Sequence, residues 1–293
     1  MLDTIKHEIC SLLKSKVLID EPLKRHTTFG VGGVASLFIY PSDVNDLKII
    51  LKYSIKNKIK TFFMGSGSNL LVSDNGFDGI VICLRKSFKH FEVNDSLEAK
   101  IGTGVMLGHI VRTLTKKSVK GLESLIGVPG TLGGALIMNA GAYGSEISNY
   151  LVSIKSISLD GKEKLYFKDD LDFSYRYSSI PKNEIVVEAK FKFEIGSLNQ
   201  IKIKKEKASQ SRRENQPLQF RSAGSIFKNP NINMAAGYLI DQANLKGIRI
   251  GDAEISTKHA NFIINHGNAS SDNIIKLIKI IKKEVFFKFK INL

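Results

Sequence analysis

The chain has 293 residues, of which 43% are hydrophobic and 24% charged, so a disordered chain is excluded and sizeable cores are expected. Lysine and arginine number 43 against 28 acidic residues, and the formal charge of +15 suits an anionic ligand, a nucleic acid or a membrane surface. The surplus follows a chain rich in lysine throughout, and no basic block is interleaved with aromatic residues, so we expect neither a nucleic-acid nor a membrane partner.

The cysteines and the N-terminus bear on the cellular compartment. Cys10 and Cys83 are isolated and form no CxxC pair, zinc set or disulfide framework, which favours a reducing compartment and predicts no metal site. The first 21 residues carry charges every few positions and lack the apolar stretch of a signal peptide. No apolar run has the length needed to span a bilayer, so we expect a cytoplasmic protein.

Residues 1–86 predict a small α/β lobe. Apolar residues at helical spacing predict a helix over 3–18, followed by a loop that contains Pro22. ASLFIYP (35–41) reads as a strand, and Ser42 is a suitable cap for a helix over 42–58. The next segments predict a strand over 61–64, a glycine turn at GSGSNLL (65–71) and a buried strand at GIVICL (79–84).

The remaining chain predicts two further domains, so that the expected ranges are 1–86, 87–196 and 197–293. Segments 91–104, 151–167 and 184–195 alternate apolar and polar residues like half-buried strands, with one helix at 108–117. The third range opens with a charged helix over 199–215. It ends with a helix over 270–289, capped by Ser270 or Ser271, which we expect to bury its apolar face against a sheet rather than on a membrane.

The glycine-rich motifs predict a nucleotide site of unusual design. No Gly-Lys-Ser/Thr P-loop occurs, and GTGVMLG (102–108) follows antiparallel strands rather than a βαβ unit. The amides of GSGSNLL could form an anion-binding concavity, with Ser66, Ser68 and Asn69 as added donors; a hairpin turn is the alternative.

GVPGTLGGALIMNAGAYG (127–144) is a second candidate for this site. Its glycines permit close backbone approach to a ligand, and Asn139 could hydrogen-bond a ring edge or a ribose. The apolar residues that could pack against an aromatic ring system are Leu132, Ala135, Ile137 and Met138.

Five ordered motifs resemble the UDP-N-acetylenolpyruvoylglucosamine reductase family from about residue 20 to the end. They are GSGSNLL, GLESLIGVPGTLGGALIMNAGAYG (121–144), FSYRYS (173–178), SAGSIFKNP (222–230) and KHANFIIN (258–265). The resemblance implies an α+β protein: a two-lobed FAD-binding fold of the vanillyl-alcohol-oxidase/PCMH type, with FAD between the lobes, plus a C-terminal α+β domain that holds the UDP-sugar. The short connection between FSYRYS and the SRRENQP segment (211–217) indicates the compact branch of the family.

The activity that this resemblance implies is the reduction of UDP-N-acetylglucosamine enolpyruvate to UDP-N-acetylmuramate in peptidoglycan synthesis, with FAD and NADPH. We expect a monomer acting on a small molecule. On the family pattern, Ser225 matches the proton donor and Arg176 the residue that stabilises the enolate-like intermediate, although on residue type alone they would read as a turn serine and a surface arginine.

Further site residues follow from the same motifs. Tyr175, Arg213 and Lys228 are expected to anchor the substrate, and His259 is expected to be structural. The expected FAD contacts are Gly65, Ser66, Gly67, Ser68, Asn69, Leu70, Gly127, Pro129, Gly130, Thr131, Gly133, Gly134, Asn139 and Gly141.

The chain departs from the family pattern in places. Asn244 and Asp252 stand where glycines are usual. The family also has a catalytic glutamate just after a segment that matches KFKI (288–291); this sequence ends at Leu293, and Glu284 lies before the segment. An FAD-binding homologue with impaired catalysis is therefore an alternative, besides a flavoprotein oxidase of the same fold and a basic nucleic-acid binder.

Overall fold

A computed structural model describes residues 8–231 and 233–293 of the chain. The chain divides into two compact units. Unit 1 contains the residues up to Glu21 together with Ala35–Ser66 and Asp78–Gln210, and unit 2 contains Pro22–Val34, Gly67–Phe77 and Ser211–Leu293. Two loops of the N-terminal region therefore group with the C-terminal residues, and the three sequential domains expected from the sequence stay a prediction.

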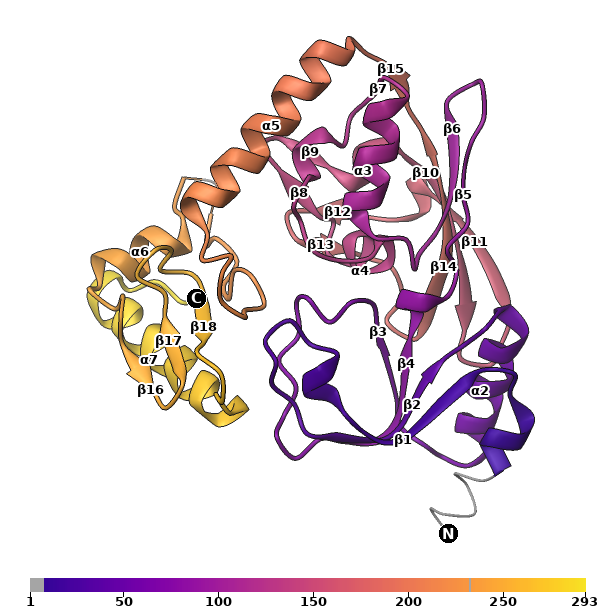
Figure 1. Ribbon diagram of the computed structural model, residues 1–293, viewed down its shortest axis with the longest axis horizontal. Helices are drawn as coiled ribbons and strands as arrows, with labels where there is room; N and C mark the ends of the chain where they lie inside the picture. Colours follow the sequence, from indigo (N-terminus) through magenta and orange to yellow (C-terminus); the bar gives the residue numbers. More distant parts are fainter. Residues whose placement is uncertain (1–7, 232) are drawn as a thin grey trace. The chain divides into compact units, whose positions relative to one another are not determined.

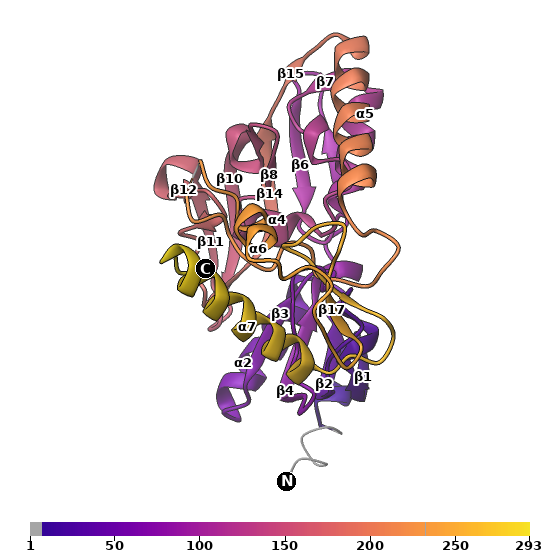
Figure 2. The same cartoon turned by 90° about the vertical axis from the view of Figure 1, so that its left-hand side faces the viewer.

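The first part of unit 1 is built on a four-stranded sheet in the order β1-β2-β4-β3. Its strands are β1 (Lys16–Pro22), β2 (Val34–Tyr40), β4 (Phe77–Cys83) and β3 (Thr61–Met64), and β3 runs parallel to β4. Helix α2 (Val44–Lys56) lies beside this sheet in both views (Figures 1 and 2), and its Leu47, Ile50 and Leu51 join the buried cluster of the sheet. The expected α/β content of this part of the chain is thus confirmed.

The start of the chain differs from the sequence prediction. Within the described residues the helical segment ends at residue 12, and residues 3–7 of the expected helix lie outside them. Val17 and Pro22 belong to β1 instead of a helix and a loop, because the run KVLI is β-prone and pairs with β2. The cap of α2 is Asp43, whose carboxylate accepts a hydrogen bond from Asp46 N at 2.9 Å, whereas Ser42 donates its hydroxyl to the Asp46 carboxylate.

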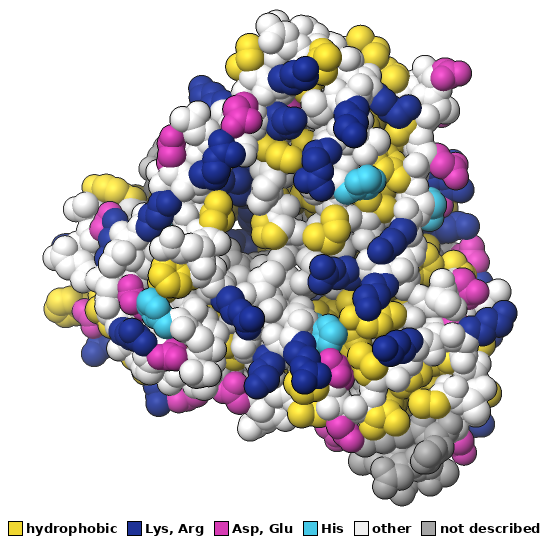
Figure 3. Space-filling view, viewed as in Figure 1, with side chains coloured by type: hydrophobic (Ala, Val, Ile, Leu, Met, Phe, Trp, Pro, Cys, Tyr) yellow, Lys and Arg dark blue, Asp and Glu magenta, His cyan; other side chains and the backbone are white. Residues whose placement is uncertain are grey.

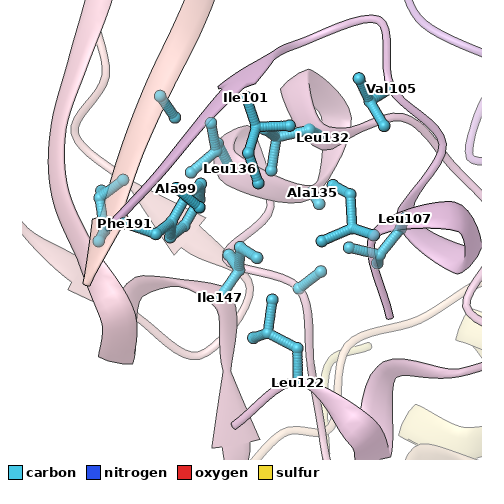
Figure 4. Close-up of a cluster of buried hydrophobic side chains, with 14 of the residues drawn as sticks. Ala99, Ile101, Val105, Leu107, Leu122, Leu132, Ala135, Leu136, Ile147 and Phe191 are labelled. Carbon is cyan, nitrogen blue, oxygen red and sulfur yellow. The ribbon is translucent and has the colours of Figure 1, made fainter. Parts of the chain in front are cut away.

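The second part of unit 1 is a five-stranded sheet in the order β11-β10-β14-β6-β5, antiparallel throughout. Its strands are β11 (Glu163–Phe167), β10 (Leu151–Ser158), β14 (Glu184–Lys192), β6 (Glu98–Gly102) and β5 (Phe91–Val93). Helices α3 (Leu107–Lys116) and α4 (Leu132–Ile137) pack against it (Figure 1). Figure 4 shows Leu132, Ala135 and Leu136 of α4 pointing into the cluster that contains Ile101 and Phe191.

Short elements complete unit 1. Strands of two residues each form three antiparallel pairs. They are β7 (Val119–Lys120) with β15 (Glu194–Ile195), β8 (Gly141–Ala142) with β9 (Ser145–Glu146), and β12 (Phe173–Ser174) with β13 (Tyr177–Ser178). The 3-10 turns of the chain are η1 (Leu23–Arg25), η2 (Leu84–Lys86), η3 (Glu123–Leu125), η4 (Ile147–Tyr150) and η5 (Lys168–Asp170). The charged helix α5 (Leu198–Asn215) then runs from unit 1 into unit 2.

Unit 2 is an α+β unit. It holds α6 (Ala236–Gln242), a three-stranded sheet of β16 (Arg249–Ile250), β17 (Ala253–Ile255) and β18 (Ile263–Asn265), and α7 (Ser271–Phe289). Ser270 caps α7: its hydroxyl accepts from Asn273 N at 3.0 Å. The apolar face of α7 is buried in the core of this unit, as expected. In the described part of the chain, no helix is long and apolar enough to cross a membrane.

Candidate active site

The GSGSNLL loop follows directly after β3. Gly65 lies so close to the second glycine-rich stretch that a Cβ added there would stand 2.2 Å from Thr131 Oγ1. The carbonyl of Gly65 accepts a contact from the buried thiol of Cys83 at 3.2 Å, and burial raises the pKa of that thiol to about 11. Gly67 has a φ of +65°, and its carbonyl accepts a hydrogen bond from Thr28 N at 3.1 Å. The loop is therefore held at its start and its centre by backbone contacts.

The residues after Gly67 are more open. Ser68 and Leu70 are half-buried, and Asn69 is exposed. Gly65 and Ser66 belong to unit 1, whereas Gly67 and the residues that follow belong to unit 2. The loop is thus one of the segments by which the chain passes from one unit to the other.

The stretch 127–144 is fixed by pairing with the IGTGV motif (101–105). Leu132 N donates to Val105 O at 2.8 Å and Gly133 N to Thr103 O at 3.0 Å, so these two amides are engaged within the protein. Gly127 and Gly130 take positive φ values of +77° and +144°. Gly127, Pro129 and Gly134 are exposed, and a Cβ at Gly134 would meet nothing closer than 4.0 Å.

The apolar residues of this stretch divide into two sets, and one part of the sequence interpretation is wrong. Leu132 and Ala135 were expected to be able to pack against an aromatic ligand, but they point into the protein core (Figure 4). The reason is helical spacing, which directs them toward the same face as Leu136. Ile137, with 43% of its surface exposed, and the half-buried Met138 stay available for such a contact.

Asn139 is completely buried and its side chain is engaged within the protein. Its Nδ2 donates to Glu146 Oε2 at 2.6 Å and to Ser174 O at 3.1 Å, and its Oδ1 accepts from Ser148 N at 3.4 Å. These bonds give the side chain a structural role. Contact with a cofactor stays a prediction for this residue.

The FSYRYS motif forms the hairpin β12–β13, which is hydrogen-bonded to the stretch 127–144. Arg176, in the turn, has a φ of +54°, and its Nη2 donates to the carbonyl of Gly141 at 2.8 Å. The Arg176 guanidinium carbon lies 5.0 Å from the centre of the Tyr175 ring, and Tyr175 is itself 47% exposed. The FSYRYS motif therefore contacts the glycine-rich stretch 35 residues before it in the sequence. The permanently charged guanidinium of Arg176 is hydrogen-bonded to the backbone of that stretch.

The SAGSIFKNP motif lies in unit 2, where its backbone is held by Asn261. Asn261 is buried; its Oδ1 accepts from Phe227 N and its Nδ2 donates to Phe227 O, both at 2.9 Å. Ser225 bridges to Phe262 and is exposed, after a glycine with a φ of +78° that has open space around it. Lys228 is also exposed. Nothing in KHANFIIN by itself indicates this role of Asn261, because its partner Phe227 lies 34 residues away in the sequence.

The two other basic or titratable residues singled out from the sequence also lie in unit 2. Arg213 is exposed in the last turn of α5, and its carbonyl accepts a hydrogen bond from Lys258 Nζ at 2.7 Å. His259 accepts a hydrogen bond from Asn261 N on Nδ1 at 3.2 Å. Burial, with a contribution from Lys246, lowers the pKa of His259. His259 thus shapes a turn as a neutral side chain, in line with the expected structural role.

Unit 2 also contains a pocket of about 600 Å³ lined by cations. Its walls include Lys24, Arg25 and Arg221 together with the hydroxyl-bearing Thr27 and Thr28. Lys and Arg side chains are also spread across the whole face shown in Figure 3, with fewer acidic side chains between them. A surface of this kind suits anionic ligands.

The residues around Gly65 and Thr131 fit a nucleotide cofactor. The Thr131 side chain lies directly against the bare backbone of Gly65, so a side chain at Gly65 would clash with it, while Gly134 and Ile137 are exposed. Bare backbone of this kind lets a flat or phosphorylated group come close. Within the residues that the structure describes, no group of three His, Cys, Asp or Glu side chains could hold a metal.

Comparisons with known proteins agree with this arrangement. Residues 35–164 match the family model of an FAD binding domain, and residues 216–293 match that of the UDP-N-acetylenolpyruvoylglucosamine reductase C-terminal domain. The chain is 39% identical to the UDP-N-acetylenolpyruvoylglucosamine reductase of Bacillus pumilus, over 97% of this chain and 94% of that protein. It is 40% identical to the reductase of Clostridium tetani, over 99% of this chain and 94% of that protein.

Solved structures give the same result. The crystal structure of a UDP-N-acetylenolpyruvylglucosamine reductase from Thermus caldophilus matches with a TM-score of 0.81 at 32% identity, over 93% of this chain and 96% of that one. A BBE-like protein of Physcomitrella patens matches at 14% identity with a TM-score of 0.50, over 67% of this chain and 44% of that one, which bears on the fold alone. The fold is the FAD-binding fold of the vanillyl-alcohol-oxidase/PCMH type with a C-terminal α+β domain. The chain belongs to the UDP-N-acetylenolpyruvoylglucosamine reductase family.

Proposed function

We propose that this protein reduces UDP-N-acetylglucosamine enolpyruvate to UDP-N-acetylmuramate, an NADPH-dependent step of peptidoglycan synthesis with FAD as the resident cofactor. One observation of the structure carries the proposal: the Arg176 guanidinium donates a hydrogen bond to the carbonyl of Gly141 in the stretch 127–144. A fixed cation at this place suits a substrate on which negative charge develops. Relatives that carry the reductase name along nearly their whole length support it.

The cofactor would be held by backbone rather than by charged side chains. The loop 65–70 and the exposed parts of 127–141 supply it, with Thr131 and Gly65 setting the distance between the two loops. When bound, FAD would supply the redox chemistry, hydride transfer between NADPH and the enolpyruvyl group.

The protein residues handle the charge and the proton of the reaction. Arg176, planar and always charged, would face the enolate-like charge and the carboxylate of the substrate. Ser225 would give a proton to the carbon beside that carboxylate, from a hydroxyl that is exposed on a segment held by Asn261. Because a serine hydroxyl is a weak acid, its neighbours must assist it. Tyr175, Arg213 and Lys228 would bind the anionic UDP-sugar.

We further propose that the protein acts as a cytoplasmic monomer. The free cysteines, Cys10 exposed and Cys83 buried, suit a reducing compartment. Size-exclusion chromatography with light scattering measures the oligomeric state.

The test is an NADPH oxidation assay on the purified chain loaded with FAD, with and without UDP-N-acetylglucosamine enolpyruvate. We expect oxidation that depends on the UDP-sugar and forms UDP-N-acetylmuramate, identified by mass spectrometry. Oxygen-driven turnover without NADPH would instead indicate an oxidase of the same fold. FAD binding without turnover would indicate the impaired homologue, which the comparisons do not favour over the reductase.

A further inference from the structure

Both N–H donors of the Asn139 side chain are used within the protein, which raises the question of their purpose. An amide side chain has two N–H donors, and both are used: one on the Glu146 carboxylate at 2.6 Å and one on the Ser174 carbonyl at 3.1 Å. The residue also has a left-handed backbone with a φ of +39°, in which asparagine is among the few tolerated non-glycine residues. It therefore connects three segments from one fully buried position.

The segment that Asn139 holds is the hairpin that carries Arg176. This hairpin has two residues in each strand, and a pair of strands that short is not stable by itself. Its position therefore depends on anchors to the stretch 137–141. Three are present: Asn139 to Ser174 O, Arg176 to Gly141 O, and the Ser178 hydroxyl to Ile137 O at 2.9 Å.

The three anchors differ in burial. Those from Arg176 and Ser178 start from partly exposed side chains, where water competes for the bond. The Asn139 side chain is fully buried, although its bonds end on the half-buried Glu146 and on the carbonyl of the exposed Ser174; its loss would remove the amide donor from both acceptors. Of the three anchors, the one from Asn139 therefore starts from the most buried side chain.

We propose that Asn139 is a positioning residue for the reductase reaction: together with Glu146 it holds the β12–β13 hairpin so that Arg176 is oriented before substrate binds. This inference rests on the proposed function, because it takes Arg176 as the group that meets the developing charge. It assigns Asn139 to the arginine rather than to the cofactor.

The main test is Asn139→Asp, because aspartate has the same shape and also tolerates the left-handed backbone but cannot donate when ionised. Hydrogen exchange of residues 173–178 is measured by mass spectrometry on the protein without cofactor. We expect exchange at least about tenfold faster than in the wild type, because one or two hydrogen bonds of the buried Asn139 amide are lost. The matched control is Asn244→Asp, at an exposed asparagine with a φ of +58°, which should leave exchange there unchanged.

The second readout separates positioning from general damage. In Asn139→Asp we expect UDP-sugar-dependent turnover to fall about tenfold or more, while reduction of the bound flavin by NADPH and the affinity for FAD change less than about twofold. In an Arg176→Ala background the same substitution should add less than about twofold, since the two residues act as one unit. Glu146→Ala, which removes the half-buried acceptor of the Asn139 amide, serves as a second variant and should show the same pattern more weakly.

Several results would overturn the proposal. Unchanged exchange of residues 173–178 in Asn139→Asp would show that Asn139 does not hold the hairpin. An equal fall in both half-reactions, or additive losses with Arg176→Ala, would show a role outside the arginine. If the wild-type chain itself has no UDP-sugar-dependent turnover, the proposed function fails, whereas the exchange experiment still decides whether Asn139 holds the hairpin.

Discussion

At the scale of single residues, Ser225 combines a fixed backbone with an exposed hydroxyl. The neighbouring Ile226 donates its N–H to Asn261 O at 2.9 Å, and Phe227 is held on both sides by the Asn261 amide. The preceding Gly224 takes a φ of +78°, which turns the chain sharply just before the serine. A hydroxyl presented in this way is suited to deliver a proton to a bound ligand.

Ser225→Ala tests this role. We expect UDP-sugar-dependent turnover to fall by about two to four orders of magnitude, because general acid catalysis contributes that much, while FAD content and flavin reduction by NADPH are kept. Stopped-flow absorbance of the flavin separates the two half-reactions. Ser96→Ala, at an exposed turn serine, is the control. A serine without catalytic function would leave both half-reactions as in the wild type.

Single residues also show what the sequence could and could not predict. Asn244, which stands where the family usually has glycine, has a φ of +58°, and asparagine is one of the residues that tolerate this conformation. The change was therefore interpretable from the sequence as a mild one. The contacts of Asn139 were not, because its partner Ser174 lies 35 residues away and nothing local indicates that they meet.

At the scale of elements, close contact between loops depends on glycine at position 65. Its φ is not in the left-handed region, so alanine is compatible with the backbone, and a substitution would act through space alone. The neighbour is Thr131 Oγ1, 2.2 Å from the added Cβ, and Thr131 is buried. The two loops would have to separate.

We therefore expect Gly65→Ala to weaken FAD binding about tenfold or more, measured by flavin fluorescence, with the fold of the protein kept. Thr131→Ala in the same chain should restore part of the affinity, because it removes the atom that clashes. Gly108→Ala is the matched control: it lies in α3, its added Cβ would meet nothing closer than 3.5 Å, and alanine favours a helix. Unaltered FAD affinity in Gly65→Ala would show that the loop spacing does not govern binding.

A buried carboxylate joins three strands of the larger sheet. Glu184, at the start of β14, accepts hydrogen bonds from Lys164 at 2.5 Å and Tyr166 at 2.9 Å in β11, and from Ser156 at 2.5 Å in β10. Burial by itself raises the pKa of Glu184, but the hydrogen bonds from Lys164, Ser156 and Tyr166 outweigh it, and the pKa lies below the ordinary value. The stabilisation is therefore present above the unfolded pKa of about 4.3 and is lost as pH falls through the folded value.

Glu184→Gln should lower the free energy of unfolding at neutral pH by about 1–3 kcal/mol. The difference in free energy of unfolding between the variant and the wild type should become smaller as the pH falls below about 4, because protonation of Glu184 removes the same interactions from the wild type. Urea unfolding at several pH values measures both effects. Glu98→Gln, at an exposed position of β6, should change stability by less than about 0.5 kcal/mol. A gap that widens in acid would contradict this account.

Elements with a strong pattern were predictable, and their boundaries were not. The alternating strands of the five-stranded sheet and the helices α2, α3, α5 and α7 follow from period-two and helical spacing. The error at β1 has a tertiary cause: the chain turns at residues 14 and 15, where Lys14 N donates to Asp46 Oδ1 at 3.3 Å and Ser15 donates to the same carboxylate. A local pattern carries no signal for a contact across 31 residues.

At the scale of the whole molecule, the charge of +15 has a use beyond solubility. Many acidic side chains of the described residues are paired with lysines, among them Glu163 with Lys48 at 2.7 Å and Glu194 with Lys120 at 2.7 Å. Basic residues still outnumber acidic ones, and Lys24, Arg25 and Arg221 line the pocket of unit 2. FAD, NADPH and the UDP-sugar are all anions, so this excess attracts every ligand of the proposed reaction.

The consequence is a specific dependence on salt. Raising the ionic strength from about 0.01 to 0.15 M shortens the Debye length from about 30 to 8 Å, so long-range attraction is screened whereas short contacts in the site remain. We expect KM for NADPH and for the UDP-sugar to rise several-fold, with kcat nearly constant, in steady-state assays at fixed pH. Sucrose of matched osmolality is the control and should leave both constants as they were.

Because a nucleic-acid binder would also be salt-sensitive, duplex DNA is added at 0.15 M, where a reductase with a merely basic surface should not be inhibited. A fall in kcat with salt at constant KM would show that salt acts on the chemical step and not on ligand binding. The surplus positive charge would then not serve to attract the anionic ligands.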